Sequence, residues 1–316
     1  MEDRQGDRED DDNPANRIAR FKQQISSFQQ VARISKDDAP GECKFVADPF
    51  IQYDPAAGLW VLFAEVAFPA RRQYIGMFTS RDLHQWDYHG DAVKGSRESF
   101  PFISPCEGYY LMVPCIDAAP APGLVAIYRA ETLLGPWLLA YHFVLDQKVN
   151  DRVIAPRSKH NSYYFVYGVS RKVLPALKYA KIEFNAAQGP VFVENSRVLL
   201  RRNIIEYIKG KFFKYPRTTL RPAGGLVKYR DGFIMPLQGT YTGRYGECIA
   251  LSYIRMTEEE LDFAAMDFIR PNEFSPDWTA CHHISFFTGE DSASPEVYAV
   301  DGHSDGTDWE VRIFVK

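Results

Sequence analysis

Two aspartates, the first of them in an otherwise apolar segment, are the side chains of this sequence best suited to acid–base chemistry. Asp48 is flanked by valine, alanine, proline and phenylalanine, where an unsatisfied carboxylate is costly to bury. Asp151 follows roughly one hundred residues later. Opposed carboxylates perform glycoside hydrolysis, one by activating water and one by protonating the leaving oxygen. We therefore predict Asp48 as a catalytic base and Asp151 as a residue that orients it or tunes its partner. The alternative, for Asp48 and likewise for Glu65, is that the carboxylate only accepts hydrogen bonds from backbone amides.

The proton donor is harder to assign. Near residue 221, where we would look for a glutamate, the sequence reads Leu-Arg-Pro. The guanidinium of Arg221 does not donate a proton near neutral pH. Glu65, Glu107 and Glu247 are the alternatives, and the sequence does not select among them; we keep Glu65 as a candidate catalytic residue. Arg221 and Arg244, together with a histidine, would instead suit an anionic ligand such as a phosphate or a uronic carboxylate.

A recurring hairpin predicts the elements that position these residues. Residues 45–67 contain two apolar runs on either side of an Asp-Pro-Ala-Ala-Gly turn, which is typical of a β-hairpin. A turn followed by an aromatic strand recurs near residues 58, 107, 160 and 230, with a weaker copy near 282. Repeats at such intervals indicate a propeller, and further strand pairs after most copies give four strands per unit.

The predicted fold is all-β, a five-bladed β-propeller with a short N-terminal helix. The expected blades are residues 45–92, 98–145, 149–200, 218–262 and 278–316. Inner strands begin near the axis, so equivalent positions should converge on one pocket. The residues expected there are Asp48 and Glu65 from blade one, Phe100 and Glu107 from blade two, Asp151 from blade three, Arg221 and Gln238 from blade four, and His282 and His283 from blade five.

We predict neither a metal nor a cofactor for this pocket. His282 and His283, together with Asp301 and His303, would make a metal-binding cluster, but adjacent residues of a strand point to opposite faces. At most one histidine of the pair can therefore face the pocket. The sequence also contains no P-loop, no GxSxG elbow and no GxGxxG followed by a helix, which removes support for nucleotide binding and for a serine hydrolase.

Composition sets limits on partners and compartment. With 316 residues, of which 46% are hydrophobic and 14% aromatic, the chain can form one large all-β domain. The formal charge is −4, and the first 13 residues contain seven acids and two bases, so no basic surplus indicates nucleic-acid binding. Five cysteines without a CxxC pair indicate a reducing, cytoplasmic location. No apolar run is long enough for a transmembrane segment.

The predicted organisation has three parts. Residues 1–14 form a disordered acidic tail, and residues 15–44 form an N-terminal helix and a linker, the helix reaching residue 34 because apolar positions recur every three or four residues. Residues 45–316 form the propeller, with a basic and aromatic insertion at 201–217. That insertion is either a solvated loop that covers a blade edge or a peripheral contact with phosphate or an anionic membrane.

Several short motifs resemble those of a known family. They are Ala47-Asp-Pro-Phe, Phe100-Pro-Phe, Tyr110-Leu-Met-Val-Pro, Ala126-Ile-Tyr-Arg-Ala, Pro136-Trp137, Arg221-Pro-Ala-Gly-Gly, Pro236-Leu-Gln and Arg244-Tyr-Gly. Together, over about 45–305, they look like the β-propeller domain of the glucosamine inositolphosphorylceramide transferases, which is similar to the five-bladed propellers of glycoside hydrolase families 43, 32 and 130. The resemblance implies an axial carbohydrate-type pocket in which Arg244 and Tyr245 contact the ligand.

The resemblance implies less about activity. In those transferases glycosyl transfer belongs to a separate domain, so this chain would be glycosyltransferase-associated rather than a transferase. Two positions depart from the pattern: Val113-Pro114-Cys115 stands where Met-Val-Pro-Glu is expected, and Cys281-His282-His283 stands where a Thr-His pair is expected. The first departure removes a candidate acid.

Three functions follow as hypotheses. The leading one is a propeller that recognises a glycan, an anionic sugar or a sugar phosphate in its axial pocket. As an enzyme it would be a glycoside hydrolase or a sugar phosphorylase that uses Asp48; as a binding module it would use the same groups only as hydrogen-bond partners. The third is a non-catalytic protein-interaction platform built from the outer rim, the insertion and the N-terminal helix.

Overall fold

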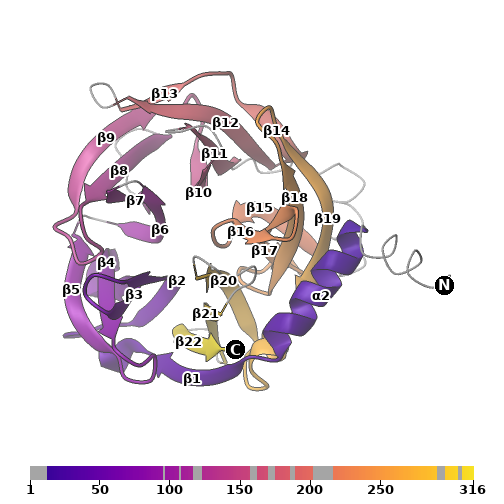
Figure 1. The fold of residues 1–316 in the computed structure, drawn as a ribbon. Helices are drawn as coiled ribbons and strands as arrows, with labels where there is room; N and C mark the ends of the chain where they lie inside the picture. Colours follow the sequence, from indigo (N-terminus) through magenta and orange to yellow (C-terminus); the bar gives the residue numbers. More distant parts are fainter. Residues whose placement is uncertain are drawn as a thin grey trace.

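Short antiparallel strands arranged as five sheets surround a central axis in the computed structural model (Figure 1). The structure describes residues 13–94, 97–106, 108–116, 123–156, 162–169, 175–185, 189–201, 216–289, 296–304 and 308–316. The acidic tail predicted over residues 1–14 lies almost wholly outside these ranges, as do residues 202–215 of the basic insertion and Glu107. The five-bladed all-β prediction is confirmed.

The first two blades are four-stranded meanders. Blade one contains β2 (Phe45–Asp54), β3 (Leu59–Phe68), β4 (Arg72–Ser80) and β5 (Asp87–Val93); blade two contains β6 (Glu98–Cys106), β7 (Tyr109–Ile116), β8 (Leu124–Ala130) and β9 (Leu138–Val144). A short 3-10 helix, η2 (Pro69–Arg71), joins β3 to β4. In both blades the first strand is innermost, as Figure 1 shows.

Blades three and four each add one short strand to this plan. Blade three contains β10 (Val149–Pro156), β11 (Ser162–Val169), β12 (Ala176–Asn185) and β13 (Gly189–Phe192), and β14 (Arg197–Arg201) also pairs with β12. Blade four contains β15 (Arg217–Pro222), β17 (Gly232–Thr240), β18 (Cys248–Met256) and β19 (Leu261–Ile269), and β16 (Val227–Tyr229) pairs with β17. The helix α4 (Pro271–Phe274) follows β19.

Blade five is assembled from both ends of the described chain. It contains β20 (Ala280–Phe287), β21 (Val297–His303) and β22 (Glu310–Val315), and its outer strand is β1 (Gln29–Ile34). Because β1 pairs with β22, from Gln29 with Val315 to Ile34 with Val311, the ring is closed by hydrogen bonds. The weak repeat near residue 282 is therefore the inner strand of its blade, whereas the other four copies lead into second strands.

The N-terminal helix is shorter than its apolar spacing predicts. Helix α2 (Pro14–Ser26) begins at the N-cap Asn13, with proline in its first turn, and the predicted extension to residue 34 is wrong because β1 begins at Gln29. Pairing with β22 outweighs the local helical periodicity there; the 3-10 helix η1 (Lys36–Asp38) then leads to blade one. Among the described residues, no helix is long and apolar enough to cross a membrane.

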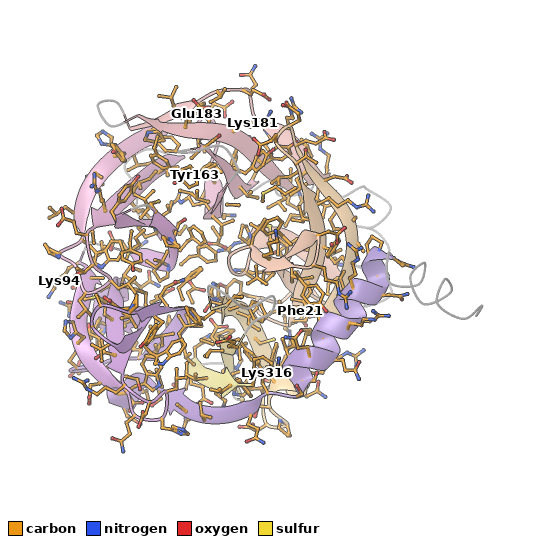
Figure 2. The ribbon with its side chains drawn as sticks, in the orientation of Figure 1. Phe21, Lys94, Tyr163, Lys181, Glu183 and Lys316 are labelled. Atoms are coloured by element: carbon orange, nitrogen blue, oxygen red, sulfur yellow. The ribbon has the colours of Figure 1, made fainter. Side chains whose placement is uncertain are left out.

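The apolar face of α2 covers the junction of blades four and five. Ile18, Phe21 and Ile25 are buried, and the Phe21 ring lies 5.1 Å from the ring of Tyr229 in blade four and 5.2 Å from that of Phe286 in blade five. Figure 2 shows Phe21 on the side of the helix that faces the propeller. The helix therefore binds two blades together.

Each inner strand is irregular at the same point. The pairing of each with its neighbour shifts register across the segments 47–50, 99–102, 150–152, 218–222 and 281–284. Such bulges change the direction of side chains, and Asp48, Phe100 and Leu220 have positive φ angles of 52°, 49° and 60°. These segments contain six of the residues predicted to converge on the axis: Asp48, Phe100, Asp151, Arg221, His282 and His283.

Candidate ligand-binding site at the propeller axis

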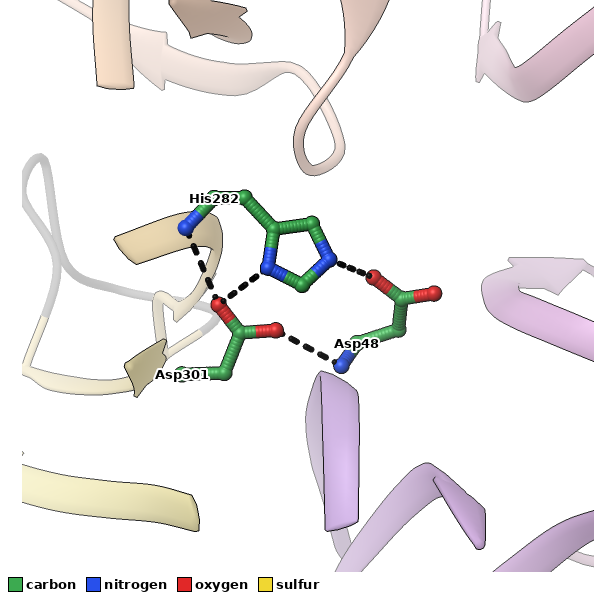
Figure 3. Close-up of side chains that lie close together, drawn as sticks. All are labelled: Asp48, His282 and Asp301. Atoms are coloured by element: carbon green, nitrogen blue, oxygen red, sulfur yellow. Dashed lines mark hydrogen bonds and ion pairs between the residues drawn. The ribbon is translucent and has the colours of Figure 1, made fainter. Parts of the chain in front are cut away.

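Three buried side chains from two neighbouring blades form the centre of the site (Figure 3). His282 of β20 lies between two carboxylates, with Nε2 3.0 Å from Oδ1 of Asp48 in β2 and Nδ1 3.0 Å from Oδ1 of Asp301 in β21. Oδ2 of Asp301 accepts a hydrogen bond from the backbone N–H of Asp48 at 2.9 Å. Asp301 therefore fixes both the imidazole and the strained backbone that carries Asp48.

The two carboxylates hold His282 in its charged form. Burial lowers the pKa of His282, but Asp301 and Asp48 outweigh burial and raise this pKa to about 10. For Asp48, burial favours the neutral acid, yet the hydrogen bond and the charge of His282 lower its pKa well below the usual value. Oδ2 of Asp48 also accepts the backbone N–H of Phe100 at 3.0 Å, so Asp48 is an ionised acceptor.

The imidazole of His283 packs against aromatic rings of blades one and two. Its ring lies 4.6 Å from the ring of Phe50 and 5.1 Å from that of Phe100. Burial lowers the pKa of His283 to about 4, so the imidazole is neutral near pH 7. Within the described part of the chain, neither ring nitrogen has a hydrogen-bond partner.

A second ion pair joins blades three and four. Arg221 of β15 donates from Nε to Oδ2 of Asp151 at 2.8 Å and from Nη2 to Oδ1 at 3.1 Å. Gln238 of β17 donates from Nε2 to Oδ2 of Asp151 at 3.2 Å. Burial raises the pKa of Asp151, and Arg221 opposes that shift. Because both oxygens of Asp151 accept N–H groups, the pair is bidentate and ionised.

An exposed aromatic turn forms the rim. The Tyr245 ring lies 4.8 Å from the His282 ring, and Cζ of Arg221 lies 5.7 Å from the centre of the Tyr245 ring. The Trp309 ring lies 4.4 Å from the His282 ring and 6.2 Å from the Tyr245 ring. Gly246 has a φ of +73°, and a Cβ there would lie 2.7 Å from the Trp309 ring. A larger residue would therefore displace the turn that presents Tyr245.

Glu247 stabilises the same turn and is not a free acid. It accepts hydrogen bonds from the backbone N–H groups of Tyr241, Thr242 and Arg244 at 3.0, 2.8 and 3.2 Å. Partial burial opposes ionisation, but the hydroxyls of Thr240 and Thr242 and these amides lower the pKa of Glu247 to about 2. Its carboxylate therefore serves as an anchor for the turn.

The remaining predicted residues have different surroundings. Glu65 of β3 accepts a hydrogen bond from Gln73 of β4 at 2.7 Å, which gives its carboxylate a partner within blade one. Phe100 is fully buried and reaches Asp48 through its backbone. Arg244 is exposed on the rim turn. The structure thus brings together Asp48, Asp151, Arg221, Gln238, Tyr245 and His282.

Sequence reasoning gave too little weight to Asp301 and missed Trp309. Asp301 entered only as a member of a metal cluster, although a carboxylate in the apolar run Tyr-Ala-Val-Asp of β21 is the same signal that identified Asp48. Trp309 precedes β22, and its contact with His282 depends on how the ends of the chain meet. The sequence carries no local signal for that contact.

Asp48, His282 and Asp301 also have the spacing of a metal site, because one ligand atom from each lies within 4.8 Å of the others. A histidine must be neutral to ligate a metal. Here each ring nitrogen lies 3.0 Å from a carboxylate oxygen, and the imidazole itself is the cation. The arrangement therefore fits a proton-mediated ion pair better than a metal centre.

Comparison with solved structures places this fold beside glycoside hydrolases. A thermostable family-43 glycoside hydrolase superposes with a TM-score of 0.65 at 13% identity, covering 88% of this chain and 91% of that chain. An endo-arabinase from Bacteroides thetaiotaomicron superposes with a TM-score of 0.61 at 12% identity, covering 89% of this chain and 95% of that chain. An exo-β-1,3-galactanase from Phanerochaete chrysosporium, solved with β-1,3-galactotriose, superposes with a TM-score of 0.60 at 13% identity. The superposition covers 90% of this chain and 64% of that chain.

These likenesses define the class of fold and nothing finer. The chain is a five-bladed β-propeller with structural neighbours in glycoside hydrolase family 43. No protein-family model matches the chain, and no curated protein matches its sequence. The comparisons give no support to the resemblance to the glucosamine inositolphosphorylceramide transferases, which stays a prediction.

The two histidines predict a stability maximum near neutral pH. His282 has a folded pKa of about 10 against an ordinary value of 6.5, so the stability it contributes is present below about pH 6.5 and is lost as pH rises toward 10. His283 has a folded pKa of about 4, so its contribution is present above about pH 6.5 and is lost as pH falls toward 4. Urea unfolding measured between about pH 4 and about pH 10 should show both losses of stability. A His282→Gln variant that kept the alkaline loss would contradict the assignment.

Proposed function

We propose that this protein binds a carbohydrate at the propeller axis and does not hydrolyse it by a paired acid and base. The observation that carries the proposal is the ion pair between Arg221 and Asp151. It places a guanidinium where we expected a glutamate as the proton donor. A site with the base but without the acid can hold a glycan, but it cannot protonate the leaving oxygen.

The carboxylates of the cluster all act as acceptors. Asp48 forms an ion pair with His282 and accepts the backbone N–H of Phe100, and Asp151 accepts N–H groups from Arg221 and Gln238. Asp301 accepts the backbone amides of Asp48, His282 and His283. Among the described residues, each carboxylate of the cluster therefore accepts hydrogen bonds, which supports an acceptor role rather than that of a proton donor.

The rim has the chemistry of a sugar-binding surface. Tyr245 is 53% exposed, and its ring lies beside the charged His282 and Arg221 groups. An aromatic face can pack on the apolar face of a pyranose, while nearby charged groups bond to its hydroxyls. A recognition role also fits the predicted resemblance, in which a propeller of this kind accompanies a separate transferase domain.

The proposal predicts binding without turnover. Wild type and Asp48→Asn would be screened by thermal shift against neutral sugars, amino sugars, uronic acids and sugar phosphates, with product analysis of every ligand that binds. Wild type should bind at least one sugar and leave it unchanged. Asp48→Asn should bind about tenfold more weakly, because the charged hydrogen bond to His282 is lost.

The control variant is Asp87→Asn, which changes an exposed aspartate of β5 and should bind like wild type. Turnover by wild type that Asp48→Asn abolishes would overturn the proposal and establish an enzyme.

A protein-interaction platform is the second candidate, and one observation favours it. Most of the exposed large apolar side chains in the described ranges lie on or beside the outer strands of blades two and three: Leu138, Leu139, Val144, Val191, Val193 and Val198. Exposed apolar clusters of this kind often mark interaction surfaces. The sequence prediction included the N-terminal helix in this platform. The apolar face of α2 cannot contact a partner, because it is buried against blades four and five.

A further inference from the structure

The axial cluster contains one more negative charge than positive. Asp48, Asp151 and Asp301 supply three carboxylates, and His282 and Arg221 supply two cations. Each cation is fully engaged, since His282 lies between Asp48 and Asp301 and Arg221 is bidentate to Asp151. A net charge in a buried cluster is costly unless a partner compensates it.

Among the residues that the structure describes, the neighbouring titratable groups do not cancel this charge. His283 is neutral, because burial lowers its pKa to about 4. Arg152 follows Asp151 in the chain, but its guanidinium donates to the backbone oxygens of Pro114 and Leu124 in blade two, at 2.8 and 3.1 Å. The phenol of Tyr245 carries no charge near neutral pH.

A buried acceptor beside the cluster also lacks a donor. Gln238 is 2% exposed, and its Nε2 donates to Asp151 at 3.2 Å, which identifies that end of the amide as the nitrogen. Its Oε1 accepts no hydrogen bond within the described part of the chain. Buried oxygens normally have a donor, so this position calls for an N–H or O–H group from outside the protein.

The cluster meets solvent on the side of Tyr245. The Arg221 side chain is 30% exposed and that of Asp151 only 2%, so a ligand must approach across the Tyr245 and Arg221 surface. The charge of Arg221 is compensated by Asp151 behind it. The face of an exposed tyrosine attracts cations, so this entrance and the cluster favour the same sign of ligand charge.

We infer that the site selects a sugar that carries a positive charge, an amino sugar with a free ammonium group. This inference rests on the proposed function and adds a substrate class to it. The ammonium supplies the missing charge to the Asp48 side of the cluster, and its N–H groups, with the sugar hydroxyls, supply donors for acceptors such as Oε1 of Gln238. An amino sugar thus takes the place of the anionic sugar that Arg221 and Arg244 suggest in the sequence alone.

The test compares matched sugars on the wild-type protein by calorimetry. Glucosamine, galactosamine and mannosamine are each paired with their N-acetyl forms, which keep the ring and remove the charge, and with the parent hexoses, glucuronate and glucose 1-phosphate. At least one free amine should bind about tenfold more tightly than its N-acetyl form, and added NaCl should reduce that difference.

The variants test the entrance. Tyr245→Ala should weaken binding of the amino sugar by about tenfold without a change in urea unfolding, because the side chain is exposed. Tyr53→Ala is the control, since Tyr53 is an exposed aromatic residue on the first hairpin, 37% exposed, and should bind like wild type.

The outcomes separate the inference from the proposed function. Tighter binding of glucuronate or glucose 1-phosphate, or equal binding of amine and N-acetyl forms, would overturn the charge selectivity while leaving a sugar-binding protein. Failure of every sugar in the sets to bind would overturn the proposed function as well.

Discussion

Replacement of Asp301 by asparagine is expected to lower the free energy of unfolding by about 3–5 kcal/mol, the range found when one partner of a buried ion pair is removed. Oδ1 of Asp301 accepts the backbone amides of His282 and His283 at 3.2 and 2.9 Å, and Oδ2 accepts that of Asp48 at 2.9 Å. Asparagine has the same shape, but either orientation of its amide turns an N–H group toward an N–H donor.

Urea denaturation followed by tryptophan fluorescence measures this effect. Asp87→Asn, on the surface of β5, is the matched control and should change stability by less than about 0.5 kcal/mol. The loss in Asp301→Asn should be greatest below about pH 6.5 and should shrink as pH rises toward 10, because the folded wild type then loses the charge of His282. An Asp301→Asn variant as stable as the control would show that Asp301 does not organise the axis.

Truncation of Phe21 to alanine is expected to destabilise the protein by about 3–5 kcal/mol, the usual cost of deleting a buried phenylalanine. The ring is fully buried and contacts rings in blades four and five at 5.1 and 5.2 Å. The cavity would therefore open where the helix joins blade four to blade five, which is the blade that β1 completes.

The control for this substitution lies on the same helix. Gln23 is exposed, so Gln23→Ala should leave the free energy of unfolding within about 0.5 kcal/mol of wild type. Both variants would be compared by urea unfolding at a fixed pH. A small loss for Phe21→Ala would mean that α2 is an appendage and that blades four and five hold together without it.

The sequence was sufficient for the architecture because the signals of a propeller are local. A turn, an aromatic strand and a second strand pair recur within each blade. Four of the five copies lead into the second strand of their blade. The position of β1 could not be found in this way. Its residues continue the apolar spacing of a helix, and only the partner strand β22, at the far end of the chain, makes residues 29–34 a strand.

The candidate site was partly predictable for a similar reason. A carboxylate in an apolar strand is conspicuous, so Asp48 was found, and the pseudo-symmetry of the blades brought Asp151, Arg221, Gln238 and His282 to the same place. The pairing of charges was not predictable, because it depends on distances between blades. Arg221 therefore suggested an anionic ligand from the sequence, whereas in the structure it compensates Asp151.

The way in which the ring closes also determines how it resists tension. Gln29 and Val315 are paired directly in the β1–β22 ladder, so a pulling force applied at these two residues acts on one end of that ladder. The pairs then open in sequence from Gln29 toward Ile34, as in a zipper, rather than sharing the load as strands do when they slide past each other. Blade five therefore yields first, and the four blades made of continuous chain come under load only after the ring has opened.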